Sequence, residues 1–299
     1  MSTDVTHAPW HDLATKGYVH VKGFLGPNEL KFLRDDYAKH RDEDSGNANY
    51  AVVNVSWMSI WRLESKMSSV AKAVREAAGV NTDLSVGALY FAIEKGIDFA
   101  WHQDHESFFI FQQHHDYLNF YIPILKSDPK HSNLSIVPFD RLLQRAPAQY
   151  NQLAFRGAQR FKTGKPTLVS NDEDGGDYTL PVDLEELKET PELEAGDLLL
   201  LRGDIIHRTQ DTDSDRISIS LRRTNSMAPI DRQRLLSGCT KKQEMISNNR
   251  AAYDHLFECF AHLKCDRVTA RQLHNFALEK ATRPVPAPAP AVVSDKALA

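Results

Sequence analysis

Residues 195–222 read AGDLLLLRGDIIHRTQDTDSDRISISLR, and this stretch decides the predicted fold. It begins with an apolar run of strand length, turns at RGD, and continues in a second short apolar run that ends in His207. After a polar turn, apolar and polar side chains alternate from residue 215 to 222, as in a strand with one buried face. Similar β-prone runs, bounded by Gly, Pro, Asn and Asp, recur from residue 84 onward, among them FAWHQDHESFFIF at 99–111 and YLNFYIPIL at 117–125. They predict an all-β barrel or sandwich.

Helical patterns flank this β region on both sides. Residues 17–25 predict a strand, and Pro27 then stands where the first residue of a helix favours proline. A second helix is predicted over 61–77, with Gly79 as its stop, and two further helices after residue 230. We therefore expect one domain over 1–282, followed by a Pro/Ala-rich, disordered tail over 283–299. Its barrel core is expected at about 84–223 and its helical C-terminal extension at about 230–282.

Composition excludes several classes of protein. The chain has 299 residues and a formal net charge of -4, so no basic excess indicates binding to nucleic acid or anionic membranes. No apolar run approaches the roughly 18 residues of a transmembrane helix, and the N-terminus lacks the features of a signal peptide. Three cysteines without a CxxC motif make a disulfide framework or zinc ribbon unexpected. These features predict a soluble, cytoplasmic protein with reduced thiols, and they leave its oligomeric state open.

Three His-x-Asp patterns occur, and their surroundings separate them. His40 lies at the end of a predicted surface helix, and His114 lies in a polar stretch between two strands. His102 and Asp104 instead follow a β-prone run and precede the apolar FFIF. Residues i and i+2 of a strand point to the same face, so this imidazole and this carboxylate can bind one ion.

His207 is the candidate third ligand. It follows directly on the apolar run, tight turn and second apolar run of the deciding stretch. Two histidines and one carboxylate on one side of an iron ion leave three positions open, as in non-haem Fe(II) oxygenases. The alternative is a hydrogen-bonded core histidine.

Arg216 begins nine residues after His207 and shares one strand face with Ser218, Ser220 and Arg222. An inward arginine in an apolar barrel needs an anion. A guanidinium can grip a carboxylate through two parallel hydrogen bonds, and the Ser218 hydroxyl can add a third. This pattern predicts a receptor for the distal carboxylate of 2-oxoglutarate, with Arg222 as the second choice if Arg216 points outward.

Four segments resemble the Fe(II)/2-oxoglutarate-dependent dioxygenases, and more narrowly their phytanoyl-CoA dioxygenase-like group. They are GYVHVKGFLGPNELKFLRDDY at 17–37, WHQDHES at 101–107, YLNFYIPILKSDPKHSNLSIVPFDRL at 117–142, and the deciding stretch. Two departures are a Pro138-Phe139-Asp140 sequence, where that group usually has Pro-Gly-Ser, and the long segment 141–195.

The resemblance implies a mainly β fold: a double-stranded β-helix (jelly-roll) barrel with flanking helices and iron at its mouth. It assigns His102, Asp104 and His207 to Fe(II), and Arg216 with Ser218 to 2-oxoglutarate. The expected reaction uses O2 and releases succinate and CO2 while a small molecule is hydroxylated, desaturated or cyclised. Further candidates are the co-substrate contacts Asn119 and Tyr121, and His105 and Glu106 beside the metal motif.

The long segment divides into a basic and an acidic half. Residues 141–170 hold six Lys and Arg residues and no acid, whereas residues 171–197 hold eleven acids and one lysine. The two halves can neutralise each other in solvent. Alternatively, the basic half forms a lid over an anionic substrate, with Arg156 and Arg160 as substrate contacts.

Two other functions remain open on this sequence. One is a non-catalytic barrel that binds the metal or 2-oxoglutarate as a sensor or scaffold. The other is a cupin-like isomerase or hydrolase that uses a different divalent metal without O2. Arg216 argues against the second, since such reactions need no anchor for a 2-oxo acid.

Overall fold

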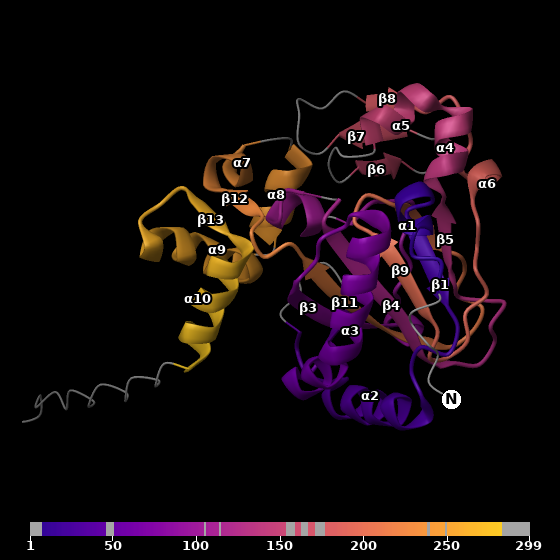
Figure 1. Cartoon of the computed structure of the whole chain (residues 1–299), viewed down its shortest axis with the longest axis horizontal. Coiled ribbons are helices and arrows are strands. Elements are labelled where there is room, and N and C mark those ends of the chain that lie inside the picture. Colours follow the sequence, from indigo (N-terminus) through magenta and orange to yellow (C-terminus); the bar gives the residue numbers. More distant parts are fainter. Residues whose placement is uncertain are drawn as a thin grey trace, which may run out of the picture.

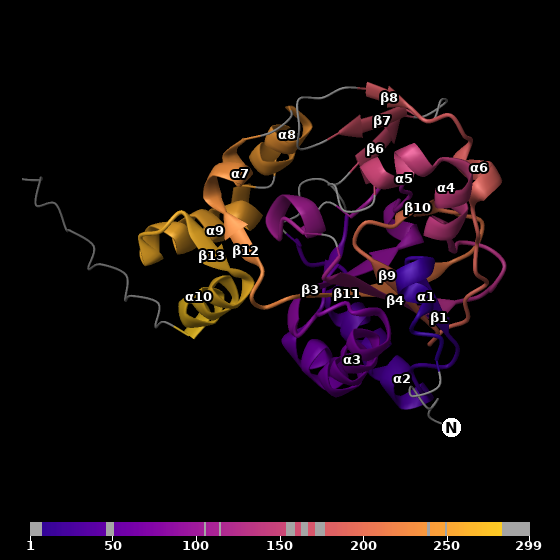
Figure 2. The same cartoon turned by 45° about the horizontal axis from the view of Figure 1, so that its top comes forward.

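A computed structural model describes residues 8–45, 51–104, 106–113, 115–153, 159–162, 167–170, 177–237, 240–248 and 250–282. The tail over 283–299, which we predict to be disordered, lies outside these residues. Figures 1 and 2 show the large sheet near the centre, with the helices α2 and α3 on one side of it. The strands β6–β8 lie at an outer edge beside α4 and α5, and α7–α10 are grouped with β12 and β13 beside one end.

The core is a six-stranded antiparallel sheet in the order β1-β9-β4-β11-β3-β2. Its two central strands are β4 and β11, which with β3 are the longest strands of the sheet. They correspond to the predicted segments 117–125 and 215–222. The strands are β1 (Tyr18–Val21), β2 (Val53–Asn54), β3 (Leu84–Ala92), β4 (Tyr117–Lys126), β9 (Leu198–Arg202) and β11 (Arg216–Thr224).

The outer face of this sheet is covered by N-terminal helices. Alternate side chains of β4 and β11, such as Phe120, Ile122 and Ile219, are buried in one cluster with residues of these helices. The predicted helix at 61–77 begins four residues earlier, because the Ser56 hydroxyl accepts a hydrogen bond from the Ser59 amide and caps it. Gly79 ends it in the left-handed conformation. The helices are α1 (Asp12–Thr15), α2 (Pro27–His40) and α3 (Trp57–Ala78).

A smaller layer faces the inner side of the sheet. It consists of β5 (Leu134–Val137) paired antiparallel with β10 (Ile206–Thr209). Single bridges of His102 to His207 and of Ile136 to Glu189 extend it on both edges. Leu199, Leu201 and Tyr121 of the large sheet pack with Ile136 of this layer. The side chains between the layers therefore include the inward residues of β4, β9 and β11.

The long segment after β5 contains its own elements. A three-stranded antiparallel sheet follows two short helices, and a third helix precedes β9. These elements are α4 (Phe139–Arg145), α5 (Pro147–Leu153), β6 (Gln159–Lys162), β7 (Thr167–Ser170), β8 (Asp177–Thr179) and α6 (Leu184–Leu187).

The C-terminal region is helical, as predicted, and also holds a two-stranded sheet. Leu84 and Tyr117 of the core share a buried cluster with Leu256, Phe260 and other apolar residues of this region. The chain outside its β core is thus largely helical. The protein therefore contains more helix than the predicted mainly β fold implied. The elements are β12 (Pro229–Asp231), α7 (Arg232–Leu236), α8 (Thr240–Asn248), α9 (Arg250–Leu263), β13 (Arg267–Thr269) and α10 (Ala270–Thr282).

None of the described helices has an apolar stretch long enough to cross a lipid bilayer.

Candidate metal and co-substrate site

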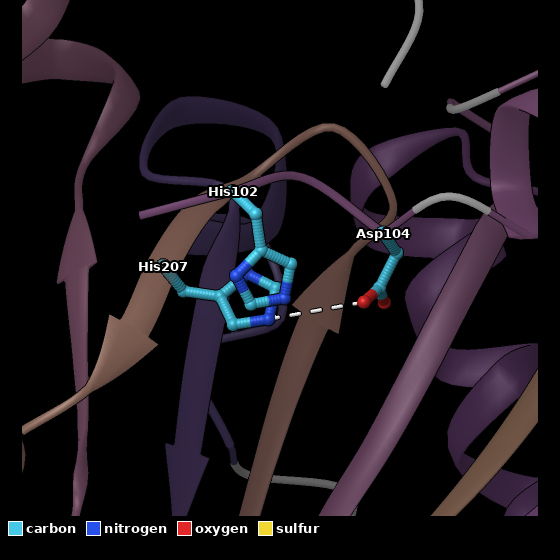
Figure 3. Close-up of side chains that lie close together, drawn as sticks. All are labelled: His102, Asp104 and His207. Atoms are coloured by element: carbon cyan, nitrogen blue, oxygen red, sulfur yellow. Dashed lines mark ion pairs between the residues drawn. The ribbon is translucent and has the colours of Figure 1, made fainter. Parts of the chain in front are cut away.

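The three predicted ligands come together between the two layers. Figure 3 shows the rings of His102 and His207 side by side, with the Asp104 carboxylate facing them. One ligand atom from each residue lies within 4.8 Å of the other two. Asp104 and His207 are buried. Two imidazoles and one carboxylate at this spacing suit a divalent transition metal.

Backbone pairing fixes the two histidines relative to each other. The His102 amide donates to the His207 carbonyl at 3.0 Å, and the His207 amide donates to the His102 carbonyl at 2.9 Å. Each Nδ1 faces the carbonyl two residues upstream, that of Ala100 at 2.7 Å and that of Ile205 at 3.1 Å. If Nδ1 carries the proton in both rings, both Nε2 atoms keep a lone pair for a metal.

The groups around Asp104 favour its ionised form despite its burial. Burial opposes ionisation, but His207, Arg222 and His102 and a hydrogen bond from Asn119 outweigh it and lower the pKa of Asp104. The Asp104 Oδ1 atom lies 3.8 Å from Nε2 of His207. The carboxylate is therefore in the charge state that a cation requires.

The chain leaves the sheet after His102, where its single β-bridge to His207 lies. Gln103 points away from the ligands, since its Nε2 donates to the Asp204 carbonyl. The Ser107 hydroxyl then donates to the Asp104 carbonyl at 2.8 Å, and residues Glu106–Ile110 form a π-helical turn, η3. The β-prone run predicted through FFIF is therefore wrong after His102. Helices with this wide turn occur mostly as single turns, often at functional sites.

Arg216 points inward and is only 2% exposed. Its Nη1 donates to the Ser132 carbonyl at 2.9 Å, and its guanidinium carbon lies 5.9 Å from the centre of the Tyr121 ring. Its Nε is buried and has no hydrogen-bond partner among the described residues. A buried guanidinium with an unused donor can receive an anion.

Three other predicted co-substrate residues lie on the same inner face. The Ser218 hydroxyl donates to the Tyr121 hydroxyl at 2.8 Å, which leaves the Tyr121 proton available to a ligand. Asn119 is committed differently, since its Nδ2 donates to Asp104 at 3.2 Å and its Oδ1 accepts from Ser220 at 2.7 Å. In this structure Asn119 orients the metal-binding carboxylate.

Arg216 and Arg222 of β11 lie at opposite ends of this inner face. Arg222 lies near Asp104 and contributes to its lowered pKa, with its guanidinium carbon 5.9 Å from the centre of the Phe91 ring. Arg216 instead lies beside the loop that contains Ser132. Both arginines are buried on the inner face, so the assignment of Arg216 rather than Arg222 to 2-oxoglutarate stays a prediction.

The predicted substrate residues are largely outside the described part of the chain. His105 and Arg156 lie outside it, and only the backbone is described for Glu106 and Arg160. His114, of the third His-x-Asp pattern, also lies outside it. His40, of the first pattern, ends α2 with its Nδ1 2.9 Å from the Asp36 carbonyl.

Two basic residues of the proposed lid are described, and both pair with the acidic half of the segment. Arg141 forms an ion pair with Glu189 and donates to the carbonyls of Leu187 and Lys188. Arg145 lies 3.6 Å from Glu186. For these two residues, mutual neutralisation of the halves describes the structure better than a lid.

One residue that contacts both ligand-bearing segments is not indicated by any sequence pattern. Glu185 of α6 accepts hydrogen bonds from Trp101 at 2.9 Å and from Arg208 at 3.1 and 3.0 Å. Trp101 precedes His102 and Arg208 follows His207, so one carboxylate joins the two ligand-bearing segments from outside. It lies some eighty residues from Trp101 in the sequence, and only the folded chain shows this contact.

Comparisons with solved structures identify the fold. No family model and no curated protein matches the sequence. EvdO2 from Micromonospora carbonacea var. aurantiaca, solved with 2-oxoglutarate, is 13% identical, with a TM-score of 0.52, over 75% of this chain and 93% of its own. SnoK, a non-haem α-ketoglutarate-dependent carbocyclase from nogalamycin biosynthesis, is 13% identical, with a TM-score of 0.50, over 77% of this chain and 89% of its own. At this level of identity, the comparison establishes a shared fold.

Proposed function

We propose that this chain, which has the fold of the Fe(II)/2-oxoglutarate-dependent oxygenases, is itself such an enzyme and oxidises a small molecule. One observation carries the proposal: the His102, Asp104 and His207 ligand atoms converge on the face that also buries Arg216 with an unused donor. A metal site alone would suit many reactions, whereas a buried cation beside it suits a co-substrate with a carboxylate.

His102, Asp104 and His207 would hold Fe(II), and Arg216, Ser218 and Tyr121 would hold 2-oxoglutarate. When bound, iron with 2-oxoglutarate and O2 supplies the oxidising power, with release of succinate and CO2. The protein contributes geometry and the exclusion of water. The paired backbone of His102 and His207 fixes the two rings, Asn119 orients Asp104, and Arg216 positions the co-substrate.

The finer assignments follow from the same proposal. The large sheet and the β5–β10 layer are proposed to close as a double-stranded β-helix, within a single domain over 1–282. Because Asp104 supplies a carboxylate, we favour hydroxylation, or desaturation or cyclisation, over halogenation; related halogenases carry Gly or Ala at the matching position. The substrate class is a small, anionic molecule, as the basic residues Arg156 and Arg160 suggest.

An anaerobic titration with Fe(II) and 2-oxoglutarate, followed in the visible range, tests the proposal without knowledge of the substrate. The charge-transfer band of the chelated complex is expected in the wild type and absent in His207→Ala. His40→Ala, from the rejected His-x-Asp pattern, is the matched control and should keep the band. Absence of the band in folded wild-type protein would instead favour a sensor or scaffold.

The substrate class needs a separate measurement. Consumption of 2-oxoglutarate that requires added Fe(II) would distinguish an oxygenase from a cupin-like isomerase. Once a substrate is found, Arg156→Ala with Arg160→Ala should raise its KM without weakening iron binding. Unchanged kinetics would remove the anionic assignment.

A further inference from the structure

Arg216 is accompanied by a second cation on the inner face. Lys126, the last residue of β4, is the direct cross-strand partner of Arg216 in β11. Directly opposed residues of antiparallel strands have their Cβ atoms about 4.5–5.5 Å apart. The two side chains therefore start from neighbouring points on the same face.

A β-bulge turns Lys126 inward. Ser218 pairs with Pro123 whereas Ile217 pairs with Leu125, so Ile124 is an extra residue in β4. The Ile124 carbonyl accepts a hydrogen bond from Nε of Arg34 in α2, and this contact holds the bulge on its outer side. Without the extra residue, alternation from Tyr121 would place Lys126 on the opposite face.

Both cations end on the same loop. Arg216 donates to the Ser132 carbonyl at 2.9 Å, and the Lys126 ammonium donates to the Asn133 side-chain carbonyl. Ser132 is fully buried with φ +53°, and the Asp211 carboxylate accepts from its amide at 2.7 Å. Asn133 is fully buried as well, and its Nδ2 donates to Pro129 and Gln210. The loop is thus held in place, and it offers both cations only neutral acceptors.

Neither cation forms an ion pair within the part of the chain that the structure describes. The hydrogen-bond acceptor of Lys126 is the Asn133 side chain, and that of Arg216 is the Ser132 carbonyl. Three carboxylates lie around Lys126: Asp128 of its own loop, Asp211 between β10 and β11, and Asp197 before β9. Asp211 pairs with His131, and Asp197 pairs with His20. Two adjacent, partly or wholly buried cations repel each other, and an anion between them would remove this repulsion.

We propose that Lys126 and Arg216 form a paired-cation receptor for the distal carboxylate of the co-substrate, and that Lys126 makes the site selective for a dicarboxylate. This inference rests on the proposed function, because it assigns a residue to the 2-oxoglutarate site. Arg216 supplies directional hydrogen bonds, whereas Lys126 supplies a compact positive charge. Lys126 is a binding residue here, since its ammonium contacts the ligand.

The charge state of Lys126 makes the inference measurable. Burial, reinforced by the charge of Arg216, lowers the pKa of Lys126 to about 8. A bound carboxylate favours the protonated amine and raises this pKa, so binding near pH 8 takes up a proton. Affinity is therefore full below pH 8 and falls as the pH rises further.

Isothermal titration calorimetry of the full-length Mn(II)-loaded protein, between pH 7 and 9.5, tests the receptor. The two ligands are 2-oxoglutarate and 2-oxopentanoate, which has the same carbon chain without the distal carboxylate. The wild type should bind 2-oxoglutarate more weakly above pH 8 and take up protons, as judged from two buffers of different ionisation enthalpy. Because 2-oxopentanoate has no distal carboxylate, it binds only through its metal-chelating end. Its affinity should therefore not fall above pH 8.

Variants assign the effect to Lys126. Lys126→Met should weaken 2-oxoglutarate binding roughly 10- to 100-fold at pH 7, as for loss of a charged hydrogen bond, and remove the proton uptake. Lys126→Arg should bind without the fall above pH 8. Lys130→Met, which removes a lysine of the same loop, should behave as wild type.

The outcomes separate the two proposals. Two results would overturn the receptor and leave the proposed oxygenase function intact. One is a wild-type affinity for 2-oxoglutarate that does not fall from pH 7 to 9.5 relative to that for 2-oxopentanoate. The other is an unchanged affinity of Lys126→Met for 2-oxoglutarate. Failure of the wild type to bind either 2-oxo acid overturns the proposed function and the receptor with it. The wild-type pH profile decides the question even if Lys126→Met does not fold.

Discussion

Arg202 and Arg216 are both almost fully buried arginines, at 3% and 2% exposure, yet their surroundings differ. Arg202 donates to both oxygens of Asp204, at 2.7 and 2.9 Å, and lies over the Phe139 ring at 4.4 Å. Arg216 has one carbonyl acceptor, a second cation beside it and an Nε without a described partner. Burial alone therefore does not distinguish a structural arginine from a binding one; the partners do.

Removing Arg202 should have the largest effect on stability. Arg202→Met leaves the buried Asp204 carboxylate without its ion-pair partner, which typically lowers the free energy of unfolding by about 3–5 kcal/mol. Chemical denaturation measures this loss. The double variant with Asp204→Leu should recover part of it, and a loss below about 1 kcal/mol would contradict the assigned structural role.

Removing Arg216 should affect binding instead. Arg216→Met should change the free energy of unfolding by less than about 1 kcal/mol, because it removes a buried cation that has no acidic partner among the described residues. Affinity for 2-oxoglutarate should fall by about 2–4 kcal/mol, roughly 30- to 1000-fold. Arg216→Lys keeps the charge and should show a smaller loss. Equal losses of stability in Arg202→Met and Arg216→Met would abolish the distinction between the two arginines.

Asn119 allows a test of the metal-binding end. Asn119→Ala removes the hydrogen bond to Asp104, and outer partners of metal ligands typically contribute 10- to 100-fold to metal affinity. A competition titration with Mn(II) should show a loss in this range. If affinity for 2-oxoglutarate falls while metal affinity is unchanged, Asn119 contacts the co-substrate, as the sequence suggested.

The smallest expected effect on stability concerns the partly exposed ion pair of Arg208 with Glu185. Burial opposes ionisation of Glu185, but hydrogen bonds from Lys188, Arg208 and Trp101 outweigh this and lower the pKa of Glu185 to about 2. A carboxyl with a depressed folded-state pKa stabilises the fold above its unfolded value of about 4.3, and this contribution is lost as pH falls toward 2.

Glu185→Gln should therefore lower stability at pH 7 by less than about 1 kcal/mol, the usual range for exposed pairs. Between pH 4.5 and 2, the stability of the variant should fall less steeply than that of the wild type. Thermal unfolding across this pH range measures both effects. Parallel pH profiles would show that Glu185 does not stabilise the contact between the ligand-bearing segments through its charge.

Local periodicity explains what could be predicted. Alternation along 215–222 placed Arg216 and Ser218 on one face, and the i, i+2 spacing paired His102 with Asp104, because side-chain direction in a strand follows from the sequence alone. The same rule failed where the backbone departs from a strand. The segment after Asp104 forms a π-helical turn, and Lys126 is turned inward by the bulge at Ile124.

By itself, the sequence determined which residue types share a face within each strand, and hence the candidates His102, Asp104, His207 and Arg216. Only the tertiary structure decided which faces meet. The pairing of Lys126 with Arg216 joins residues ninety positions apart, and the bulge that permits it is held by a contact from α2. Strand register and bulges depend on packing between distant segments, so periodicity within one segment does not specify them.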